Sequence, residues 1–424
     1  MEGPTRLVVS TVNSSYRRRM SLLLVARWVV NADGTQLLSD HGVWVDGDTI
    51  VSVGPVSELR SSAARVLDLG EVTLLPGFVD AHTHVSVRPG EGDQHGQLAR
   101  PPAWLALRAA RNVEAMLASG VTTARIMGEP AAIDFAARAL VASGDVMGPS
   151  LRVAGEALSA THGHGVALGV ADGVEGVRLA VRRNLAAGAD HVKFFMTGGV
   201  SSSSGRLFDH HYRREEVRAI VDEAHRVGRR VAVHAHGGPG VSICAEEGVD
   251  SIEHGSLLTE ENVALMVKHG TSLVLTKSIA HHPEGIEKGD ASAPAVLSKL
   301  MEARKADVAS FERVRQAGLR FALGTDAMHG FFGEEIGWLV DRGVPAPEAF
   351  LAATWEGARV LGEEDTLGRL QAGFKADVVA LAGNAFDAPR EALEGVRWVM
   401  KGGRPYEVTG RRGEGRVLPS PDLV

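Results

Sequence analysis

The sequence of 424 residues contains one cysteine, Cys244, and few aromatic residues, which make up 5% of the chain. A single cysteine excludes a disulfide within the chain, and on that basis we expect a reducing, cytoplasmic location. Cys244 lies in the helical pattern GVSICAEEG, which favours a buried apolar thiol over a reactive nucleophile. Because aromatic side chains are scarce, the core is expected to consist mainly of aliphatic residues.

Long hydrophobic runs and a strong excess of one charge are also lacking. No apolar run reaches the roughly 18–20 residues that span a bilayer, so no membrane association is expected. The chain has 45 Lys and Arg against 52 Asp and Glu, a net charge of −7, which argues against a general nucleic-acid partner. Residues 1–19 end in three arginines with no small-residue cleavage site after the short apolar run that follows, and we interpret them as a disordered extension or an upstream start codon.

The two ends of the chain share a β-rich texture that differs from the middle. Residues 20–75 and 371–424 are rich in Val, Leu and Ile, with turn-forming residues such as Asp46-Gly47-Asp48 between the apolar runs. The economical interpretation is one small β-sandwich domain that both termini build. Residues 76–370 are then expected to form a second, larger domain.

In that middle region, short apolar strands alternate with helical patterns, such as those at 102–120 and 214–228. The eight strand candidates are GFVDAHTHV, VTTARIM, SLRVAG, HVKFFMTG, RVAVHAHG, SIEHG, TSLVLT and FALGTDA. Eight strands alternating with helices predict an α/β fold of the (β/α)8 barrel (TIM barrel) type. A doubly wound open sheet is the rival, but it would not need eight strands.

Functional residues of such a barrel gather where the strands end. His82 and His84 close the first strand, and their spacing of two places both imidazoles on one face, where they could chelate one metal ion. Taken alone, a motif of this kind is more often a pair of structural histidines.

Lys193 lies between the apolar residues Val192 and Phe194 in the fourth strand candidate. A lysine that points into a barrel needs an explanation, because burying an unpaired ammonium group is unfavourable. A salt bridge is one explanation. The alternative is that CO2 adds to the amine and gives a carbamate, an anion that could bridge two divalent metal ions.

Three further polar residues lie at strand ends. His234 falls in the fifth strand candidate, His254 ends the sixth, and Asp326 ends the eighth. Neutral imidazole and carboxylate are the usual zinc ligands, although they also accept manganese, cobalt or iron. Together with the first and fourth strands, these positions predict a metal site at one mouth of the barrel.

These motifs, with GVTTARIMG and GRLQAGFKADVVAL, resemble the amidohydrolase superfamily over nearly the whole chain from Met20 onward. The fourth-strand lysine and the GHG loop resemble most the branch of imidazolonepropionase-related hydrolases and prolidase-like dipeptidases, which includes ochratoxin-type amidases. The resemblance implies two divalent ions, with zinc the first choice. It implies that His82, His84 and Asp326 hold the more buried ion, His234 and His254 hold the second, and a carboxylated Lys193 bridges both.

The resemblance also implies a mechanism in which metal-bound hydroxide attacks an amide carbonyl. Asp326 would take the proton from the attacking group and deliver it to the leaving nitrogen. His162 and His164 lie in the loop ATHGHG, whose glycines let the backbone approach a ligand. We expect a substrate-polarising role here, for His164 rather than His162.

Other residues are expected to contact the substrate. Tyr212 and Arg214 follow the serine-rich loop 201–204, and related peptidases bind the terminal carboxylate of the substrate near this loop; a solvated helix N-terminus is the alternative. His236 is expected near the metals without being a ligand, and His329, just beyond Asp326, is expected to line the pocket. His162 completes the predicted substrate-binding set.

The sequence therefore predicts a binuclear hydrolase that cleaves the amide bond of a small molecule, either a dipeptide or an N-acyl amino acid. A cyclic-amide hydrolase or a deaminase of a heterocycle is the alternative on the same barrel, although deaminases of this fold typically lack the fourth-strand lysine. A non-catalytic scaffold that has lost its metals is a third interpretation, against which the intact ligand set argues. By resemblance, a homo-oligomer is expected.

Overall fold

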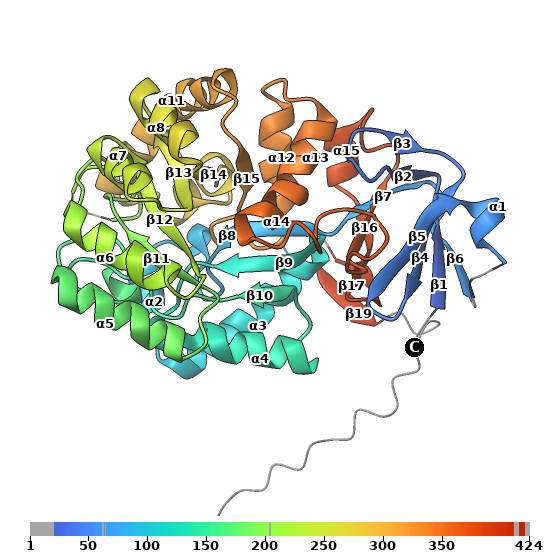
Figure 1. Cartoon of the computed structure of the whole chain (residues 1–424), viewed down its shortest axis with the longest axis horizontal. Helices are drawn as coiled ribbons and strands as arrows, with labels where there is room; N and C mark the ends of the chain where they lie inside the picture. The colour runs from blue at the N-terminus through green and yellow to red at the C-terminus, as the bar shows by residue number, and fades with distance from the viewer. Residues whose placement is uncertain (1–20, 62, 64, 203–204, 411–414, 420–424) are drawn as a thin grey trace, which may run out of the picture.

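The computed structural model describes residues 21–61, 63, 65–202, 205–410 and 415–419. The described chain is a mixed α/β protein (Figure 1). Strands from both ends of the chain lie together at one end of the molecule, and the alternating strands and helices of the middle region fill the rest. The predicted extension over residues 1–19 lies outside the described residues.

Eight parallel strands form the centre of the middle region. They are β8 (Phe78–Thr83), β9 (Val121–Ile126), β10 (Ser150–Arg152), β11 (His191–Phe195), β12 (Arg230–Gly237), β13 (Ser251–Leu257), β14 (Ser272–Leu275) and β15 (Phe321–Leu323). The first three pair in the order β10-β9-β8, and the other five pair in chain order. Each of the eight segments predicted as a strand coincides with one of them, although β13 continues two residues beyond the predicted SIEHG.

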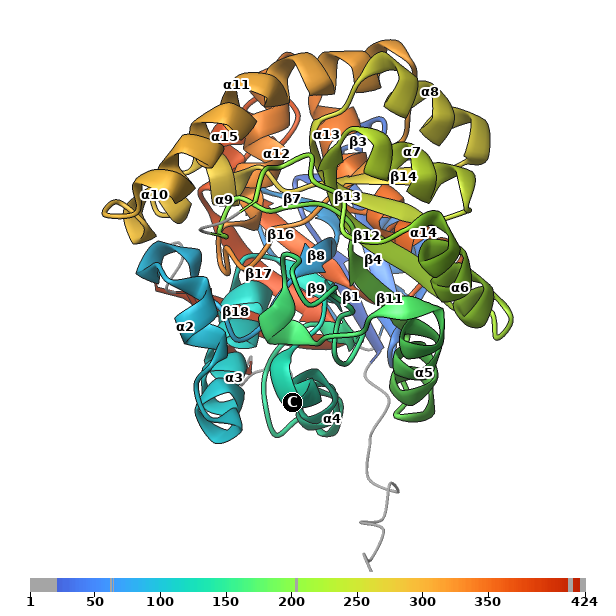
Figure 2. The same cartoon turned by 90° about the vertical axis from the view of Figure 1, so that its left-hand side faces the viewer.

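The two parallel sheets meet at both of their edges. On one side, the Leu158 amide donates to the Lys193 carbonyl and the Phe195 amide donates to the Leu158 carbonyl, both at 2.9 Å. On the other side, the Asp326 amide donates to the His82 carbonyl at 2.9 Å. Figure 2 shows the strands at the centre with helices arranged around them.

Helices connect these strands, and most of them cover the outer side. They are α2 (Gln94–Leu98), α3 (Pro102–Ala118), α4 (Ile133–Ser143), α5 (Gly173–Ala186), α6 (Arg214–His225), α7 (Pro239–Glu246), α8 (Glu260–His269), α9 (Ser278–His281), α10 (Ile286–Gly289), α11 (Pro294–Gln316), α12 (Phe332–Val340), α13 (Ala346–Ala353) and α14 (Trp355–Leu361), with 3-10 turns η1 (Pro89–Glu91), η2 (Pro130–Ala132) and η3 (Val166–Leu168). Helices α2, α9 and α10 contribute instead to a pocket at the carboxyl ends of the strands. Helix α8 shows how the sequence sets the limits: the Thr259 side chain accepts from the Asn262 amide at its start, and Gly270 ends it with a φ of 74°. Among the described residues, we find no helix with both the length and the apolar character that crossing a bilayer requires.

The remaining strands form two sheets that join the chain ends. One has the order β5-β4-β1-β6 and the other β19-β18-β17-β16-β7-β2-β3. The strands are β1 (Ser21–Val25), β2 (Trp28–Val30), β3 (Leu37–Leu38), β4 (His41–Asp46), β5 (Thr49–Pro55), β6 (Arg65–Asp68), β7 (Val72–Pro76), β16 (Val378–Ala382), β17 (Val396–Lys401), β18 (Arg404–Thr409) and β19 (Arg416–Pro419), with the short helices α1 (Val56–Leu59) and α15 (Pro389–Leu393). Strand β7 pairs antiparallel with β16, so segments about 300 residues apart share a sheet.

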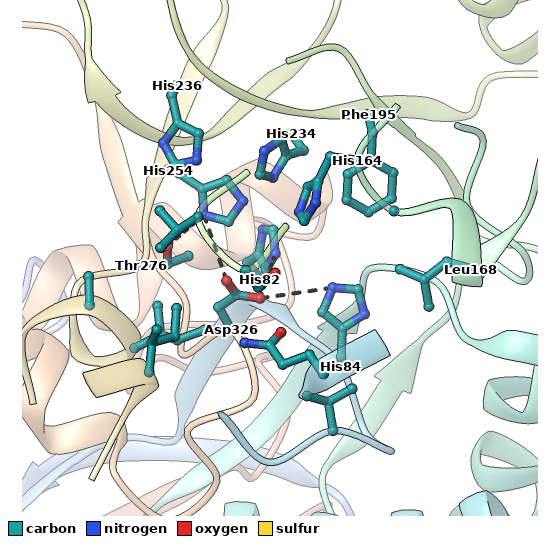
Figure 3. Close-up of a pocket in the computed structure, with 18 of the residues that line it drawn as sticks. His82, His84, His164, Leu168, Phe195, His234, His236, His254, Thr276 and Asp326 are labelled. Atoms are coloured by element: carbon teal, nitrogen blue, oxygen red, sulfur yellow. Dashed lines mark hydrogen bonds and ion pairs between the residues drawn. The ribbon is translucent and has the colours of Figure 1, made fainter. Parts of the chain in front are cut away.

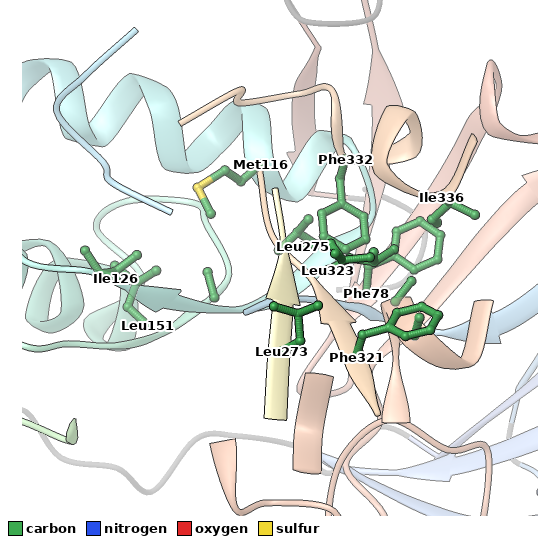
Figure 4. Packing of buried hydrophobic residues seen from close by; sticks show 14 of the residues in the cluster. Phe78, Met116, Ile126, Leu151, Leu273, Leu275, Phe321, Leu323, Phe332 and Ile336 are labelled. Carbon is green, nitrogen blue, oxygen red and sulfur yellow. The ribbon is translucent and has the colours of Figure 1, made fainter. Parts of the chain in front are cut away.

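The buried core is mainly aliphatic, as the composition predicts (Figure 4). A small aromatic group lies where the terminal strands lead into β8: Phe78 stacks on Phe332 with ring centroids 5.4 Å apart and on Phe350 at 6.4 Å. Each such buried side chain stabilises the fold by roughly 1.5–3 kcal/mol. Cys244 is fully buried, and burial raises the pKa of its thiol, in agreement with the predicted structural role.

Candidate active site

A pocket opens at the carboxyl-terminal side of the parallel strands, and the six predicted metal ligands line it together. Figure 3 labels all of them except Lys193. His82 comes from β8 and His84 follows that strand directly. The others come from β11, β12, β13 and the residues after β15, namely Lys193, His234, His254 and Asp326. Strands far apart in the sequence thus deliver six side chains to one place, because their carboxyl ends face the same way.

Asp326 lies at the centre of the imidazoles. Its Oδ1 is 3.4 Å from His82 Nε2 and 3.9 Å from His84 Nε2, and its Oδ2 is 3.9 Å from His254 Nδ1. Burial acts to raise the pKa of Asp326, but the nearby histidines and Lys193 outweigh burial and hold it well below its usual value. The ligand atoms of His82, His254 and Asp326 lie within 4.8 Å of one another, a spacing that suits one metal ion.

Lys193 is buried at the floor of the pocket, with 1% of its surface exposed. Its Nζ has no hydrogen-bond partner among the described residues, and it lies 4.8 Å from the centroid of the Phe195 ring. Burial lowers the pKa of Lys193 to about 8, although Glu253 and Asp326 act in the opposite direction. No carboxylate of the described chain lies within ion-pair distance of Nζ, so a direct salt bridge does not account for this lysine.

Glu253 and Arg125 form a buried ion pair that contacts His82. Glu253 Oε2 lies 2.8 Å from His82 Nδ1, and Glu253 Oε1 accepts from Arg125 Nη2 at 2.8 Å. Burial opposes ionisation of Glu253, but Arg125 and His82 together lower its pKa to about 2. An ionised carboxylate only accepts hydrogen bonds, so His82 carries its proton on Nδ1 and directs Nε2 toward Asp326.

The backbone at His254 explains how Glu253 reaches the cluster. In a regular strand, consecutive side chains point to opposite faces. His254 has a φ of 75°, in the left-handed region that non-glycine residues rarely adopt, and its ring lies 4.7 Å from that of His82. Two consecutive residues of β13 therefore both contact His82. Asp326 has a similar conformation, with a φ of 47°.

Neighbouring groups orient the other imidazoles. His84 Nδ1 lies 2.9 Å from the Gly128 carbonyl, His254 Nδ1 lies 2.7 Å from Thr276 Oγ1, and His234 Nε2 lies 3.2 Å from the Gly198 carbonyl. Burial lowers the pKa of His84 to about 4 and holds those of His234 and His254 well below their usual value. The histidines are therefore neutral near pH 7, the form in which imidazole binds a metal.

His164 and His236 lie in the same pocket. The ring of His164 is 4.6 Å from that of His234, and its Nδ1 lies 2.6 Å from Ser202 Oγ. His236 lies 5.3 Å from the His254 ring. Both residues are thus beside the predicted ligands, and their roles toward a substrate stay predictions.

Four other expected substrate contacts lie outside the lining of this pocket. The Tyr212 hydroxyl is buried and donates to the Ala171 carbonyl, and Arg214 is exposed and paired with Glu246 and Glu247. These partners satisfy both side chains, so the expected recognition of a carboxylate by Tyr212 and Arg214 finds no support in the geometry. His329 Nε2 lies 3.2 Å from the carbonyl of Val87, a residue that lines the pocket. His162 is exposed and lines an adjoining outer cavity, which shares His95 and Ser201 with the pocket.

Sequence reasoning missed Glu253 and Arg125. The signal that singled out Lys193, a charged residue within an apolar strand, also marks both of them in SIEHG and VTTARIM. Their partners could not be predicted, because Arg125 contacts two other strands: it donates to the Ala81 carbonyl of β8 at 2.7 Å, and to Ser251 Oγ at 3.1 Å and Glu253 of β13.

Comparisons with known proteins identify the family of this chain. The Amidohydrolase family profile matches residues 73–405. Ochratoxinase from Aspergillus niger is 32% identical over 377 residues, which cover 80% of this chain and 76% of that protein. Imidazolonepropionase from Streptomyces griseus subsp. griseus is 27% identical over 387 residues, covering 83% of this chain and 87% of the relative.

Solved structures of similar chains point to the same family. A Xaa-Pro dipeptidase with methionine bound in its active site superposes with a TM-score of 0.84 and 30% identity, covering 91% of this chain and all of that one (100%). The family match spans well over half of the chain, and the ochratoxinase match is more than 30% identical over most of both proteins. The chain therefore belongs to the amidohydrolase family and is a hydrolase that acts on C–N bonds.

Proposed function

We propose that this protein is a binuclear metal-dependent hydrolase that cleaves the amide bond of a dipeptide or an N-acyl amino acid. The observation that carries the proposal is the buried Lys193 amine, which has no hydrogen-bond partner among the described residues and lies in the same pocket as Asp326 and the four histidines predicted as ligands. The similarity to an ochratoxinase and to a Xaa-Pro dipeptidase supports an amide or peptide substrate.

The residues fit two divalent ions and a carbamate. A free ammonium in this buried position would be unfavourable, whereas the neutral amine that a lowered pKa makes accessible can combine with CO2. His82, His84 and Asp326 would hold one ion, and His234 and His254 the other, with the carbamate of Lys193 between them. Zinc suits this set of nitrogen and oxygen donors. When bound, the ions would lower the pKa of a water molecule and polarise the amide carbonyl.

The side chains of this chain then have distinct roles. Asp326 is held ionised by the imidazoles around it, so it can accept a proton and pass it to the leaving nitrogen. His164 lies beside His234 and is fixed by Ser202, which suits a group that orients the carbonyl of the substrate.

The fold belongs to the same proposal. The hydrogen bonds that join the two parallel sheets at both edges support a closed (β/α)8 barrel over residues 76–370. The pairing of β7 with β16 supports a small β-sandwich domain made from residues 20–75 and 371–424. Assembly into a homo-oligomer and a cytoplasmic location stay predictions of the sequence.

A substrate panel tests the proposed activity. Purified protein supplied with zinc and bicarbonate is assayed with N-acetyl and N-hexanoyl amino acids and with dipeptides, beside an Asp326→Asn variant. We expect release of the free amino acid from at least one member, and a loss of at least about 100-fold in kcat for the variant, because general acid–base catalysis contributes 10²–10⁴-fold. If the zinc-loaded protein turns over no member of the panel, the proposal fails.

A further inference from the structure

The segment 199–202, which follows β11, packs against the ring of His164. Ser202 Oγ lies 2.6 Å from His164 Nδ1. A Cβ atom added to Gly199 would lie 2.3 Å from His164 Nε2, and the next two atoms that it would meet belong to the same ring. The absence of a side chain at Gly199 therefore lets the imidazole lie directly against the backbone, while the Ser202 hydroxyl sets the rotation of the ring.

The opposite surroundings of this ring belong to the candidate active site. The His164 ring is 4.6 Å from that of His234 and 5.3 Å from that of Phe195, and Figure 3 shows it between the two. The backbone of His164 is held separately, because Ser159 Oγ donates to its carbonyl at 2.6 Å. The placement of the imidazole beside His234 thus depends on the segment 199–202.

Lys299, on α11, ties this segment to a helix about 100 residues further along the chain. Lys299 is 8% exposed, and its Nζ donates to the carbonyl of Ser202 and, at 3.4 Å, to that of Gly199. A buried ammonium group needs acceptors that replace its hydration, so these contacts bind the segment to α11. Val200 adds an apolar contact, because it packs in one hydrophobic cluster with residues of the same helix.

We propose that Lys299 is a positioning residue for hydrolysis: it holds the segment 199–202 in the shape that keeps the His164 imidazole beside His234. This inference rests on the proposed function, in which His164 orients the carbonyl of the substrate. Lys299 is not among the residues that line the pocket, so it acts through Gly199 and Ser202 and not on the substrate itself.

The first test measures the environment of the ring without any turnover. Proton–nitrogen correlation spectra of full-length protein, labelled in its histidines and supplied with zinc, report both ring nitrogens, and His164→Gln identifies the resonances of His164. Lys299→Met and Ser202→Ala should both move these resonances, since each removes a contact that fixes the ring. Lys305→Met, at an exposed position of α11, should leave them in place, and His41 of β4 serves as an internal reference for intact folding. Unmoved His164 resonances in Lys299→Met would overturn the inference.

A second variant displaces the ring while Lys299 stays. Gly199→Ala adds a methyl group where the His164 ring lies, and the end of a side chain can move aside. We therefore expect shifted His164 resonances with a nearly unchanged midpoint of denaturant unfolding. Gly176→Ala on α5, where the added methyl group meets no atom within 4 Å, is the matched control. If Gly199→Ala leaves the His164 resonances in place, the segment does not hold the ring and the inference fails.

Kinetics show whether the position of the ring matters for hydrolysis. With zinc-loaded protein and the panel member of highest kcat/KM, Lys299→Met should lower kcat by about 10- to 100-fold, since a displacement of about 1 Å can have that effect. KM should change less, because a group that orients the carbonyl acts most strongly in the transition state. In a His164→Ala background, the same substitution should cause no further loss. Equal losses of kcat in both backgrounds would show that Lys299 does not act through His164.

The outcomes separate this inference from the proposed function. Turnover of the panel with full kcat in Lys299→Met overturns the inference, while the proposed hydrolysis stands. Absence of all turnover by zinc-loaded protein, with the His164 resonances moved in Lys299→Met and Gly199→Ala, overturns the proposed function, while the placement of the ring by Lys299 stands.

Discussion

At the scale of single residues, the pocket depends on buried charged groups that act on one another. Glu253 is a buried carboxylate and Asp326 a partly buried one, yet both are held ionised, because Arg125 contacts the first and histidines surround the second. Lys193 experiences the opposite effect, since burial dominates and lowers its pKa. The result is a set of anionic oxygens and neutral nitrogens, which is the donor chemistry that divalent ions require.

Removing the lysine tests its proposed role directly. Lys193→Ala should bind fewer divalent ions and lose most of its hydrolytic activity, since the bridging carbamate can no longer form. Metal content by mass spectrometry and kcat report the two effects. Lys268→Ala, at an exposed position of α8, serves as the control. A Lys193→Ala protein with full activity would show that the carbamate is not needed.

Glu253 should act on the metal through His82. Glu253→Gln keeps the size of the side chain but removes the charge that fixes the His82 proton on Nδ1, and the affinity for zinc should fall by about 10- to 100-fold. Competition with a metal chelator measures that affinity. Glu175→Gln, whose side chain is 88% exposed, should leave the affinity unchanged. An unchanged affinity for zinc in Glu253→Gln would show that this residue does not act on the metal through His82.

The residues that form the site could be predicted more completely from the sequence than the partners that those residues contact. The sequence placed six ligands at strand ends, and the structure brings all six into one pocket. From the sequence, Tyr212 and Arg214 were expected to contact the substrate, because they follow a loop near the site. Their hydrogen-bond partners Ala171, Glu246 and Glu247 lie 30 or more residues away in the chain. Such contacts depend on the packing of helices, which no local pattern encodes.

At the scale of elements, a buried ion pair connects α11 to the strands that carry the site. Lys277 follows β14, and its Nζ donates to Asp307 Oδ1 of α11 at 2.5 Å and to the His254 carbonyl at 3.2 Å. Both side chains are at most 2% exposed. Because His254 has a strained backbone, this contact to its carbonyl helps to hold the conformation that places its ring beside Asp326.

Breaking that pair should destabilise the protein. Lys277→Met leaves Asp307 buried with His281 as its remaining partner, and the free energy of unfolding should fall by about 3 kcal/mol, the lower part of the range for a broken buried pair. Denaturant unfolding measures the change. Lys288→Met breaks an exposed pair with Glu284 and should change stability by less than about 1 kcal/mol. Equal effects in the two variants would contradict the argument.

The strands themselves were well predicted, because each one is a short apolar run between glycines or polar turns. The left-handed conformation of His254 within β13 was not predicted, although SIEHG contains the glycine that follows this residue. A φ of 75° at His254 is maintained by contacts to Thr276 and Lys277, which the local sequence does not contain. Alternation alone would have placed Glu253 away from the cluster, and this is why its role was missed.

At the scale of the whole molecule, the two ends of the chain come together beside the region that carries the site. Their shared β-rich composition predicted that they would associate, and β7 pairs with β16 in the seven-stranded sheet. The order of strands within the two terminal sheets could not be predicted, because apolar strands of similar length can pair in many ways. Strand β7 leads through Gly77 directly into β8, so the terminal sheet and the strand with His82 are adjacent in the chain.

Removal and return of the metal tests the central claim most directly. The protein is treated with a chelator, dialysed, assayed with N-hexanoyl-L-leucine, and then titrated with zinc in the presence of bicarbonate. We predict that hydrolysis disappears with the metal and returns as about two equivalents of zinc per chain bind, as a two-ion site requires. Hydrolysis that persists in the fully metal-depleted protein would contradict the account.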